Sequence, residues 1–493
     1  MGDEGEADLQ RRLAREVAIF EGQEALHQHA PAFGWRNAQF LAPALTRAFG
    51  RDEVHAIYAE TLAAAVQRTG AATVFSLGCG DGAQEIAVLR RADALGLPRF
   101  RIQGLELAPA VVARANAAAA AAGYADRFEA LAGDLNAGLP GDGPVAAVMA
   151  HHALHHFVAL EAIFDSVAAR LHPEGALVTF DMIGRNGHMR WPEVRPLVRR
   201  LWAMLPPDRR HDHMFGCPRP YFQDWDCAIE GFEGVRAQDI LGLLAERFLP
   251  ERLVAWGGLT DVFISPRQAP NFDIACAEDR AFLTAVTLLE QRLLAERRTT
   301  PTEMAAVFRS RRGRFRPDPK VATALARALR RPGETFASLE SEAFPSPYRP
   351  LPAPPPPALR LDEPEPLGPG TPAAATLREG WEAPHPGGAW AILDEQSLAF
   401  TLPEPAKRVV LRVWSNLPAH RGPAISAEAT GGAAAATGPL GPGDLRDLAL
   451  VAPAPRRDWE IRLRSAAYRR PDEDGGADLR PLAYQLASIT ALR

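Results

Sequence analysis

The sequence predicts a doubly wound α/β domain with helical additions, followed by an all-β sandwich. Over about the first 340 residues, short apolar runs alternate with helix-like stretches, which is the pattern of a parallel sheet with crossover helices. Twelve of the 28 residues from Pro345 to Pro372 are proline, and such a run favours an extended spacer. After it come short apolar or alternating runs separated by Gly, Pro and Asp, which favour antiparallel strands.

Five strands and three intervening helices are expected in the first part. The strand runs are 73–77, 101–105, 128–131, 145–150 and 176–182, and the helical stretches are 83–94, 109–122 and 160–171. Open sheets of this kind bind ligands outside the carboxyl ends of their strands. We therefore look for functional residues directly after each strand.

The remaining segments are assigned more coarsely. Residues 192–250 are expected to form a helical cap, followed by a hairpin of strands 252–256 and 261–265 joined through Gly257-Gly258. Residues 277–330 are expected to be helical, since Thr300-Pro301-Thr302-Glu303 is typical of a capping box. The predicted divisions are an N-terminal helical segment at 1–50, an α/β domain at 51–266, a helical extension at 267–343, a proline-rich linker at 344–374 and a β-sandwich at 375–493.

The composition of the chain excludes several classes of function. The chain has 493 residues and a formal net charge of -5, so no overall positive field would gather nucleic acid. Its two lysines, Lys320 and Lys407, lie in settings unsuited to Schiff-base or phosphate-loop chemistry. No apolar run approaches the roughly 20 residues needed to span a bilayer. We expect a cytoplasmic protein with no membrane span and no nucleic-acid partner.

A glycine-rich turn follows the first predicted strand. Gly78-Cys79-Gly80-Asp81-Gly82 leads from that strand into a helix, so backbone N–H groups can approach a ligand at the start of the helix. Glu106 and Leu107 end the second strand, where a carboxylate can hold a ribose diol. These features alone also fit a nicotinamide dinucleotide site.

Later motifs favour a different cofactor. Gly133-Asp134-Leu135 follows the third strand, the fourth strand leads into His151-His-Ala-Leu-His155-His156-Phe157, and Leu171-His-Pro-Glu-Gly175 precedes the fifth. In this order the motifs resemble those of class I S-adenosylmethionine-dependent methyltransferases over roughly residues 50–265. The resemblance implies a Rossmann-like fold and S-adenosyl-L-methionine as cofactor. It implies the cofactor-binding residues Gly78, Cys79, Gly80, Asp81, Gly82, Glu106, Leu107, Asp134 and Leu135.

One position departs from the family pattern. The family usually carries an acidic residue early in the glycine motif, and this chain has Ser76 there. Asp81 is the expected substitute. The departure also favours a competing hypothesis, a non-catalytic S-adenosylmethionine-binding scaffold or a protein that binds glycan or protein. A nicotinamide oxidoreductase is a third hypothesis, which Asp134 and the histidine motif oppose.

Transfer of a methyl group to a hydroxyl needs alignment and a base. Histidine suits the base at neutral pH, and the candidate catalytic residues are His151, His155 and His156; the alternative is that they only pack the loop. The segment from Arg185 to Trp191 follows the fifth strand and could border the acceptor. No metal site is expected, because His211 and His213 do not share a helix face and no paired ligand motif completes a set with Cys217.

The acceptor is expected to be a small molecule or a glycan. The C-terminal strands resemble small sandwich modules attached to bacterial enzymes that build or decorate surface glycans.

Overall fold

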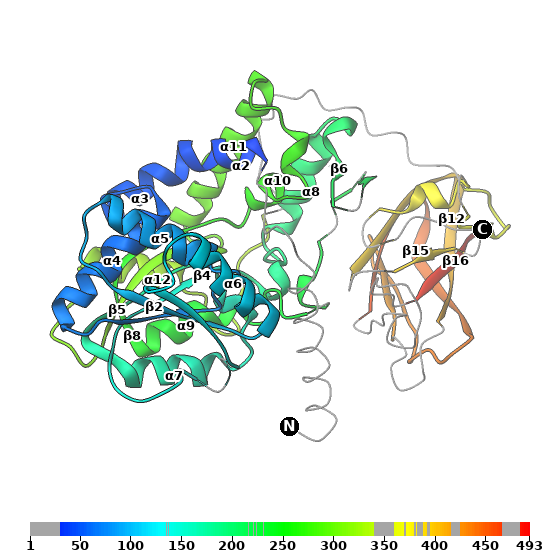
Figure 1. The fold of residues 1–493 in the computed structure, drawn as a ribbon. Coiled ribbons are helices and arrows are strands. Elements are labelled where there is room, and N and C mark those ends of the chain that lie inside the picture. The colour runs from blue at the N-terminus through cyan, green and yellow to red at the C-terminus, as the bar shows by residue number, and fades with distance from the viewer. Residues whose placement is uncertain are drawn as a thin grey trace. The chain divides into compact units, whose positions relative to one another are not determined.

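The structure is a computed structural model, and its two parts are described separately. It describes residues 30–339 apart from 135, 137, 215, 220, 223 and 230, and also 359–368, 371–378, 381, 388–391, 395–415, 424–465 and 484–493. The chain divides into two compact units (Figure 1). The first comprises Met1–Pro218 and Trp225–Arg349, and the second comprises Arg219–Asp224 and Pro350–Arg493. Because the described residues begin at 30 and leave out 340–358, the expected segment 1–50 and the linker 344–374 are described only in part.

The first unit is built on a seven-stranded sheet of order β3-β2-β1-β4-β5-β9-β8. The first five of these strands in that order are parallel, and β9 is antiparallel to both of its neighbours. The predicted doubly wound class is confirmed. The strands are β1 (Thr73–Leu77), β2 (Arg101–Glu106), β3 (Phe128–Ala132), β4 (Val145–His151), β5 (Leu171–Met182), β8 (Phe248–Trp256) and β9 (Glu303–Ser310).

Helices cover both faces of this sheet. Along β4, Ala147 and Met149 face one core and Val148 and Ala150 face the other, as the two-residue period of a strand requires. Burial on both sides explains why the strands are nearly continuous apolar runs. The first core packs against α3 (Ala42–Phe49), α4 (Val54–Thr69), α5 (Ala83–Ala94) and α6 (Pro109–Ala121), and the second against α7 (Leu160–Arg170), α9 (Ala237–Arg247) and α12 (Pro319–Ala328).

Two sequence predictions at the far end of the sheet are wrong. The expected hairpin does not form, because β8 pairs with β9 and Asp261–Ile264 is a short helix, α10. The segment from Glu303, expected to be helical, is the strand β9. Its residues 304–310 are all buried, since β9 lies between β5 and β8 and is covered on both faces. The surrounding sheet overrides the local capping signal.

The expected cap is only partly a separate layer. Helices α8 (Arg195–Met204), α10 and α11 (Ala277–Ala295) share a group of aromatic contacts that includes Trp202, Phe263 and Phe282. Helix α9, within the same expected stretch, instead joins α7 on the sheet. The other elements of this unit are α2 (Pro31–Arg36), η1 (Asn37–Leu41), η3 (Leu154–His156), η4 (Asn186–His188), η5 (Pro207–Arg209), β6 (His211–Asp212), β7 (Cys217–Pro218), η6 (Cys227–Ile229) and η7 (Ala269–Asn271).

The second unit is an all-antiparallel sheet that fits a β-sandwich. Its order is β10-β16-β12-β15-β13-β14, and β11 also pairs with β16. The register of β12 against β15 shifts between Thr401 and Arg408, so β12 is one long strand with an irregularity near its middle. Phe400, Trp459 and Tyr484 lie in its core. The elements are β10 (Glu365–Pro366), η8 (Ala374–Thr376), β11 (Ala389–Trp390), β12 (Glu395–Ser415), β13 (Ser426–Ala429), β14 (Ala433–Ala436), β15 (Asp444–Arg464) and β16 (Gln485–Leu492).

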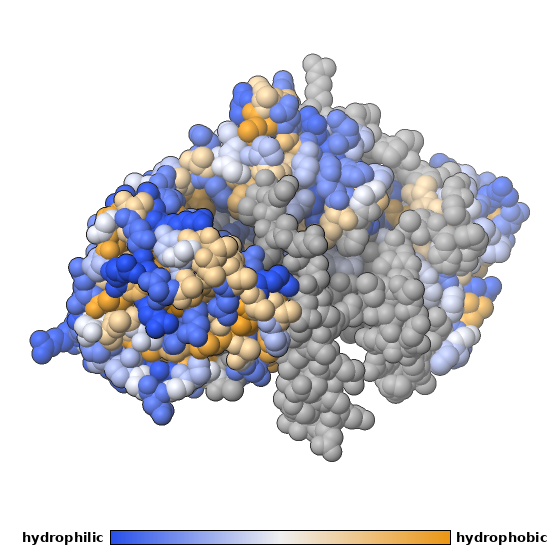
Figure 2. All heavy atoms as spheres, in the orientation of Figure 1, coloured by the Kyte–Doolittle hydropathy of each residue, from blue (hydrophilic) through white to orange (hydrophobic). Residues whose placement is uncertain are grey.

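The visible surface mixes polar and apolar residues. Figure 2 shows hydrophilic side chains spread between smaller apolar areas on the face drawn. Four large apolar side chains are exposed among the described residues: Met214, Leu288 of α11, and Leu445 and Val451 of β15. Of the helices the structure describes, none has the length and apolarity required to cross a bilayer.

Candidate functional site

The glycine turn connects β1 to α5 at the carboxyl edge of the sheet. Gly78, Gly80 and Gly82 have φ of 65°, 52° and 77°, a region that L-residues with a Cβ rarely occupy. A Cβ at Gly82 would lie 2.5 Å from the Phe128 ring, whereas one at Gly80 would meet no atom within 4 Å. The turn is therefore tightly packed on its inner side and open at Gly80.

Glu106 at the end of β2 lies against this turn. Its Oε2 accepts a hydrogen bond from Gly80 N (3.1 Å), and its Oε1 accepts from Leu107 N (2.8 Å) and Ala108 N (3.2 Å). These bonds place the carboxylate beside the open side of Gly80. Cys79 is buried, and its Sγ fills the space next to Gly104, so its role in the described structure is packing.

The other expected cofactor residues differ in their setting. Asp134 follows β3 and is exposed, and its Oδ1 accepts from the backbone and side-chain nitrogens of Asn136 (2.9 and 2.8 Å). Asp81 Oδ1 accepts from Ala83 N (3.1 Å) at the start of α5. Leu135 lies outside the described residues. The order of strands places Asp134 at the same edge of the sheet as Glu106 and the glycine turn.

A buried carboxyl group that the sequence analysis missed adjoins Ser76. The hydroxyl of Ser76 donates to Glu85 Oε1 (2.6 Å). Glu85 belongs to α5 and is 2% exposed, and its Oε2 has no hydrogen-bond partner among the described groups. Burial raises the pKa of Glu85 to about 7, against the opposing effect of the Ser76 hydrogen bond. The acidic group beside Ser76 is thus Glu85, whereas Asp81 accepts from the backbone nitrogen of Ala83 next to the N-cap Gly82.

The loop after β4 packs against the glycine turn. A Cβ at Gly78 would lie 2.8 Å from Ala153 Cβ, so these two loops have almost no space between them. β1 and β4 are neighbours in the sheet, and the chain order reverses direction there, which is where open α/β sheets bind ligands. His152 in this loop has φ of 47°, a conformation that non-glycine residues adopt mainly under constraint.

His151 is half-buried, and a tyrosine that the sequence analysis also missed holds it in place. Tyr58 of α4 donates its hydroxyl hydrogen to Ala150 O (2.6 Å), and its Oη lies 3.3 Å from His151 Nδ1. Since that hydrogen is already used, the contact requires a hydrogen on Nδ1, which leaves Nε2 as the acceptor of the neutral ring. Burial, assisted by His152, lowers the pKa of His151 to about 3.

His155 occupies a different electrostatic environment. Its Nδ1 lies 2.6 Å from Asp181 Oδ1, and Asp181 Oδ2 accepts from Ala153 N and Leu154 N. Its Nε2 lies 3.4 Å from Glu233 Oε1. Burial alone would lower the pKa of His155, but the negative charges of Asp181 and Glu233 outweigh it and raise that pKa to about 10. His155 is therefore protonated at neutral pH in this arrangement.

The other polar residues singled out in the sequence differ in their contacts and in their exposure to solvent. His156 Nε2 lies 3.5 Å from Glu233 Oε2. Trp191, in the segment expected to border an acceptor, is 5% exposed, and Asp181 at the end of β5 is 1% exposed, so both are part of the interior. In the 211–217 stretch, His213 Nε2 contacts Asn271 Oδ1 (2.9 Å) and Asp212 pairs with Arg267. Glu233 was not singled out in the sequence, because nothing near it in the chain marks it.

One family model matches this region. Residues 74–175 match a family described as a methyltransferase domain, a range that begins in β1, ends in β5 and contains the glycine turn, Glu106, Asp134 and the histidine loop. No curated protein matches the sequence.

Solved structures with related chains are distant. A geranyl diphosphate C-methyltransferase from Streptomyces coelicolor A3(2), solved with S-adenosyl-L-homocysteine, is 14% identical, with 60% of this chain and 98% of that chain covered and a TM-score of 0.32. Mitomycin 7-O-methyltransferase is 17% identical, with 61% and 68% covered and a TM-score of 0.28. Because these likenesses are weak, the domain is assigned from the family match together with the strand order.

Proposed function

Since the chain contains a class I methyltransferase domain and is an S-adenosylmethionine-dependent methyltransferase, we propose that it methylates a hydroxyl group of a small molecule or a glycan. The cofactor supplies an activated methyl group when bound. The protein has to hold that cofactor, align the acceptor oxygen and receive its proton.

The cofactor is assigned to the carboxyl ends of β1, β2 and β3. The open side of Gly80 allows a ligand to approach the backbone, and the Glu106 carboxylate beside it still has acceptor capacity for ribose hydroxyls. Asp134 is exposed at the same edge and can accept from the adenine amino group. These residues fit S-adenosylmethionine, because Glu106 supplies acceptors for the ribose hydroxyls and Asp134 supplies an acceptor for the adenine amino group.

The packing of the histidine loop on the glycine turn is the observation that carries the proposal. Ala153 of this loop lies against Gly78, which supports an acceptor position between the histidine loop and the expected cofactor. Neutral His151 can receive the acceptor's proton at Nε2, while protonated His155 can stabilise negative charge on the acceptor oxygen. We assign catalytic roles to His151, His155 and His156 on this basis.

The non-catalytic alternative loses its main argument. That hypothesis depended on Ser76 in place of an acidic residue. The Glu85 carboxyl group, 2.6 Å from the Ser76 hydroxyl, supplies an acidic group at the same point of the glycine motif. A missing charge at residue 76 is therefore no sign of lost turnover.

Methyl transfer to oxygen can be tested directly. The full chain would be incubated with methyl-labelled S-adenosylmethionine and a panel of phenols, sugars and amines, and the products identified by NMR spectroscopy and mass spectrometry. We expect S-adenosylhomocysteine to form together with a labelled methyl ether. Label found only on nitrogen or carbon would reject O-methylation, and no turnover across the panel or with metabolite extracts would support a scaffold.

The histidine roles have a separate signature. Replacing the general base should lower kcat by roughly two orders of magnitude while cofactor affinity is nearly unchanged. His151→Gln removes the acceptor nitrogen yet keeps a side chain of similar length. His172→Gln is the matched control, because His172 lies at the start of β5 and its Nδ1 accepts from Glu174 N (3.1 Å). Equal kcat for both variants would reject His151 as the base.

A further inference from the structure

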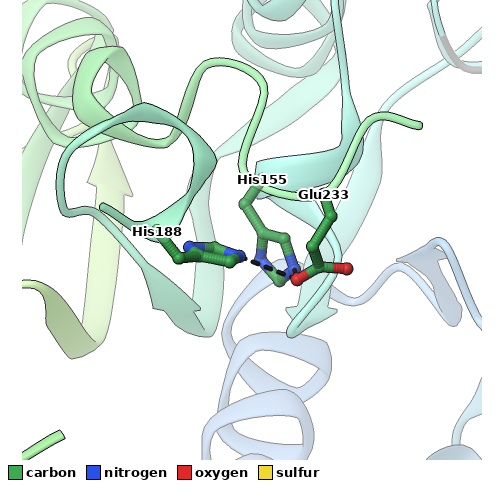
Figure 3. A group of neighbouring side chains, drawn as sticks. All are labelled: His155, His188 and Glu233. Atoms are coloured by element: carbon green, nitrogen blue, oxygen red, sulfur yellow. Dashed lines mark hydrogen bonds and ion pairs between the residues drawn. The ribbon is translucent and has the colours of Figure 1, made fainter. Parts of the chain in front are cut away.

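Three side chains from distant parts of the sequence meet beside the histidine loop. His155 comes from η3, His188 from η4, and Glu233 from the segment before α9; Figure 3 shows the two imidazole rings and the carboxylate pointing toward one another. His188 Nε2 lies 2.7 Å from Glu233 Oε1, and His155 Nε2 lies 3.4 Å from the same oxygen. One ligand atom from each residue falls within 4.8 Å of the others.

The orientation of His155 suits a metal ligand. The Asp181 carboxylate, 2.6 Å from Nδ1, keeps a hydrogen on that nitrogen and directs Nε2 toward Glu233. Metal-binding histidines commonly have such a carboxylate on the nitrogen that does not bind the metal. Asp181 is in turn fixed by backbone donors at Ala153, Leu154 and Met182.

The segment that carries Glu233 is fastened to the segment that carries His188. Gly187 N donates to Gly234 O (2.8 Å), and a Cβ at Gly234 would lie 2.9 Å from the His188 ring, so glycine permits this close approach. Arg236 donates to Val158 O (2.9 Å) and pairs with Glu161 of α7. The three side chains are thus held in place before any ligand binds.

His188 has an unusual environment at the ring nitrogen that does not face Glu233. His188 Nδ1 is buried and has no hydrogen-bond partner among the described residues. His188 also has φ of 53°, a conformation with a strain cost for a residue with a Cβ. Backbone strain of this kind clusters at active sites and ligand-binding sites.

We propose that His155, His188 and Glu233 bind one divalent cation of the zinc class. Two imidazoles and one carboxylate favour Zn²⁺ over Mg²⁺ or Ca²⁺, which prefer oxygen ligands. Three protein ligands leave a coordination position for an exchangeable oxygen, as in catalytic zinc sites. The cation replaces the proton on His155 Nε2 and supplies the positive charge that the protonated ring carries when no cation is bound.

The role of the cation rests on the proposed function. An acceptor hydroxyl bound at the open position would lose its proton more readily, because a divalent cation stabilises the resulting oxyanion. This would supplement His151, whose low pKa makes it a weak base. Metal binding itself can be measured without any acceptor, so the two proposals can fail separately.

The test is a calorimetric titration of Zn²⁺ into the full chain after treatment with a chelator and dialysis. We expect one equivalent to bind, and cobalt(II) in its place to give the visible spectrum of a low-coordinate site. His188→Gln and Glu233→Gln should each weaken Zn²⁺ binding by about tenfold or more. His211→Gln, from the histidine pair whose rings lie 4.9 Å apart, should bind Zn²⁺ as the wild type does.

Thermal unfolding separates metal binding from misfolding. Glu233→Gln keeps an acceptor oxygen for His188 Nε2 but removes the negative charge beside protonated His155. The metal-free variant should therefore still unfold cooperatively, at a lower Tm than the metal-free wild type, while Zn²⁺ raises the Tm of the wild type alone. The proposal is overturned if the wild type binds no Zn²⁺, if both site variants bind it unchanged, or if His211→Gln abolishes binding. Titration of S-adenosylhomocysteine into the metal-free chain measures cofactor binding in the absence of Zn²⁺. The proposed function can therefore be tested separately from the metal site.

Discussion

At the scale of single residues, the charge state of a side chain depends on neighbours that the sequence does not mark. The histidines could be placed after the fourth strand from sequence alone. Their pKa values could not, because Tyr58, Asp181 and Glu233 come from separate elements. Glu85 was missed for the same reason: it meets Ser76 only when α5 packs on β1.

Glu85 predicts a pH dependence of stability. Its pKa rises from 4.5 to about 7 on folding because of burial, so between these values the native protein binds more protons than the unfolded chain. The free energy of unfolding should therefore fall as pH rises through this window. Relative to Glu85→Gln, the cofactor-free wild type should lose on the order of 3 kcal/mol between pH 4.5 and 8.

Urea unfolding of both proteins at several pH values measures this difference. Glu129→Gln is a suitable control, since the Glu129 side chain is 48% exposed on β3. A difference between wild type and Glu85→Gln that stays constant with pH would show that Glu85 ionises normally in the native state.

At the scale of elements, the sequence predicted those whose local pattern agrees with their environment. The first five strands and their crossover helices have clear apolar runs, and all form near the predicted positions except that β5 begins at Leu171 instead of residue 176. β9 was read as a helix because Thr300 to Glu303 carries a capping signal, whereas its continuous apolar run has no period that distinguishes a buried strand from a buried helix. Its neighbours β5 and β8 decide the outcome.

The contact between the glycine turn and the histidine loop predicts a selective effect of alanine at Gly78. Gly78 and Gly96 both have positive φ (65° and 63°), but only at Gly78 would a Cβ collide, 2.8 Å from Ala153 Cβ. Gly96→Ala should cost about 1 kcal/mol of stability from backbone strain. Gly78→Ala should cost about 1–3 kcal/mol more and weaken cofactor binding.

Denaturant unfolding and titration of S-adenosylhomocysteine check both effects. If Gly78→Ala and Gly96→Ala lose the same stability and retain the same affinity, the two loops do not pack as closely as described.

At the scale of the whole molecule, the chain divides into an α/β unit and an antiparallel unit. The sequence could predict this division because proline excludes regular structure between the two and because the apolar pattern changes after it. The segment Arg219–Asp224, which groups with the second unit, could not be foreseen, since nothing in its composition distinguishes it. The predicted boundaries at 343 and 375 stay predictions.

Truncation tests whether the second unit contributes to the cofactor site. No cofactor motif lies after residue 343, so a chain that ends there should bind S-adenosylhomocysteine within about tenfold of the full chain, or about 1.4 kcal/mol. Calorimetry with both chains gives the ratio. A truncated chain that unfolds, or that loses the cofactor, would mean that the two parts depend on a shared core.

The most direct measurement is a calorimetric titration of S-adenosylmethionine into the full chain and its Glu106→Ala and Glu129→Ala variants. The wild type and Glu129→Ala should bind one molecule per chain. Glu106→Ala should bind more weakly by on the order of 2 kcal/mol, about 30-fold, because the charge-assisted hydrogen bonds to the ribose are lost. A wild type that binds no S-adenosylmethionine, or that binds a nicotinamide dinucleotide instead, would contradict the assignment of this edge of the sheet as the methyl-donor site.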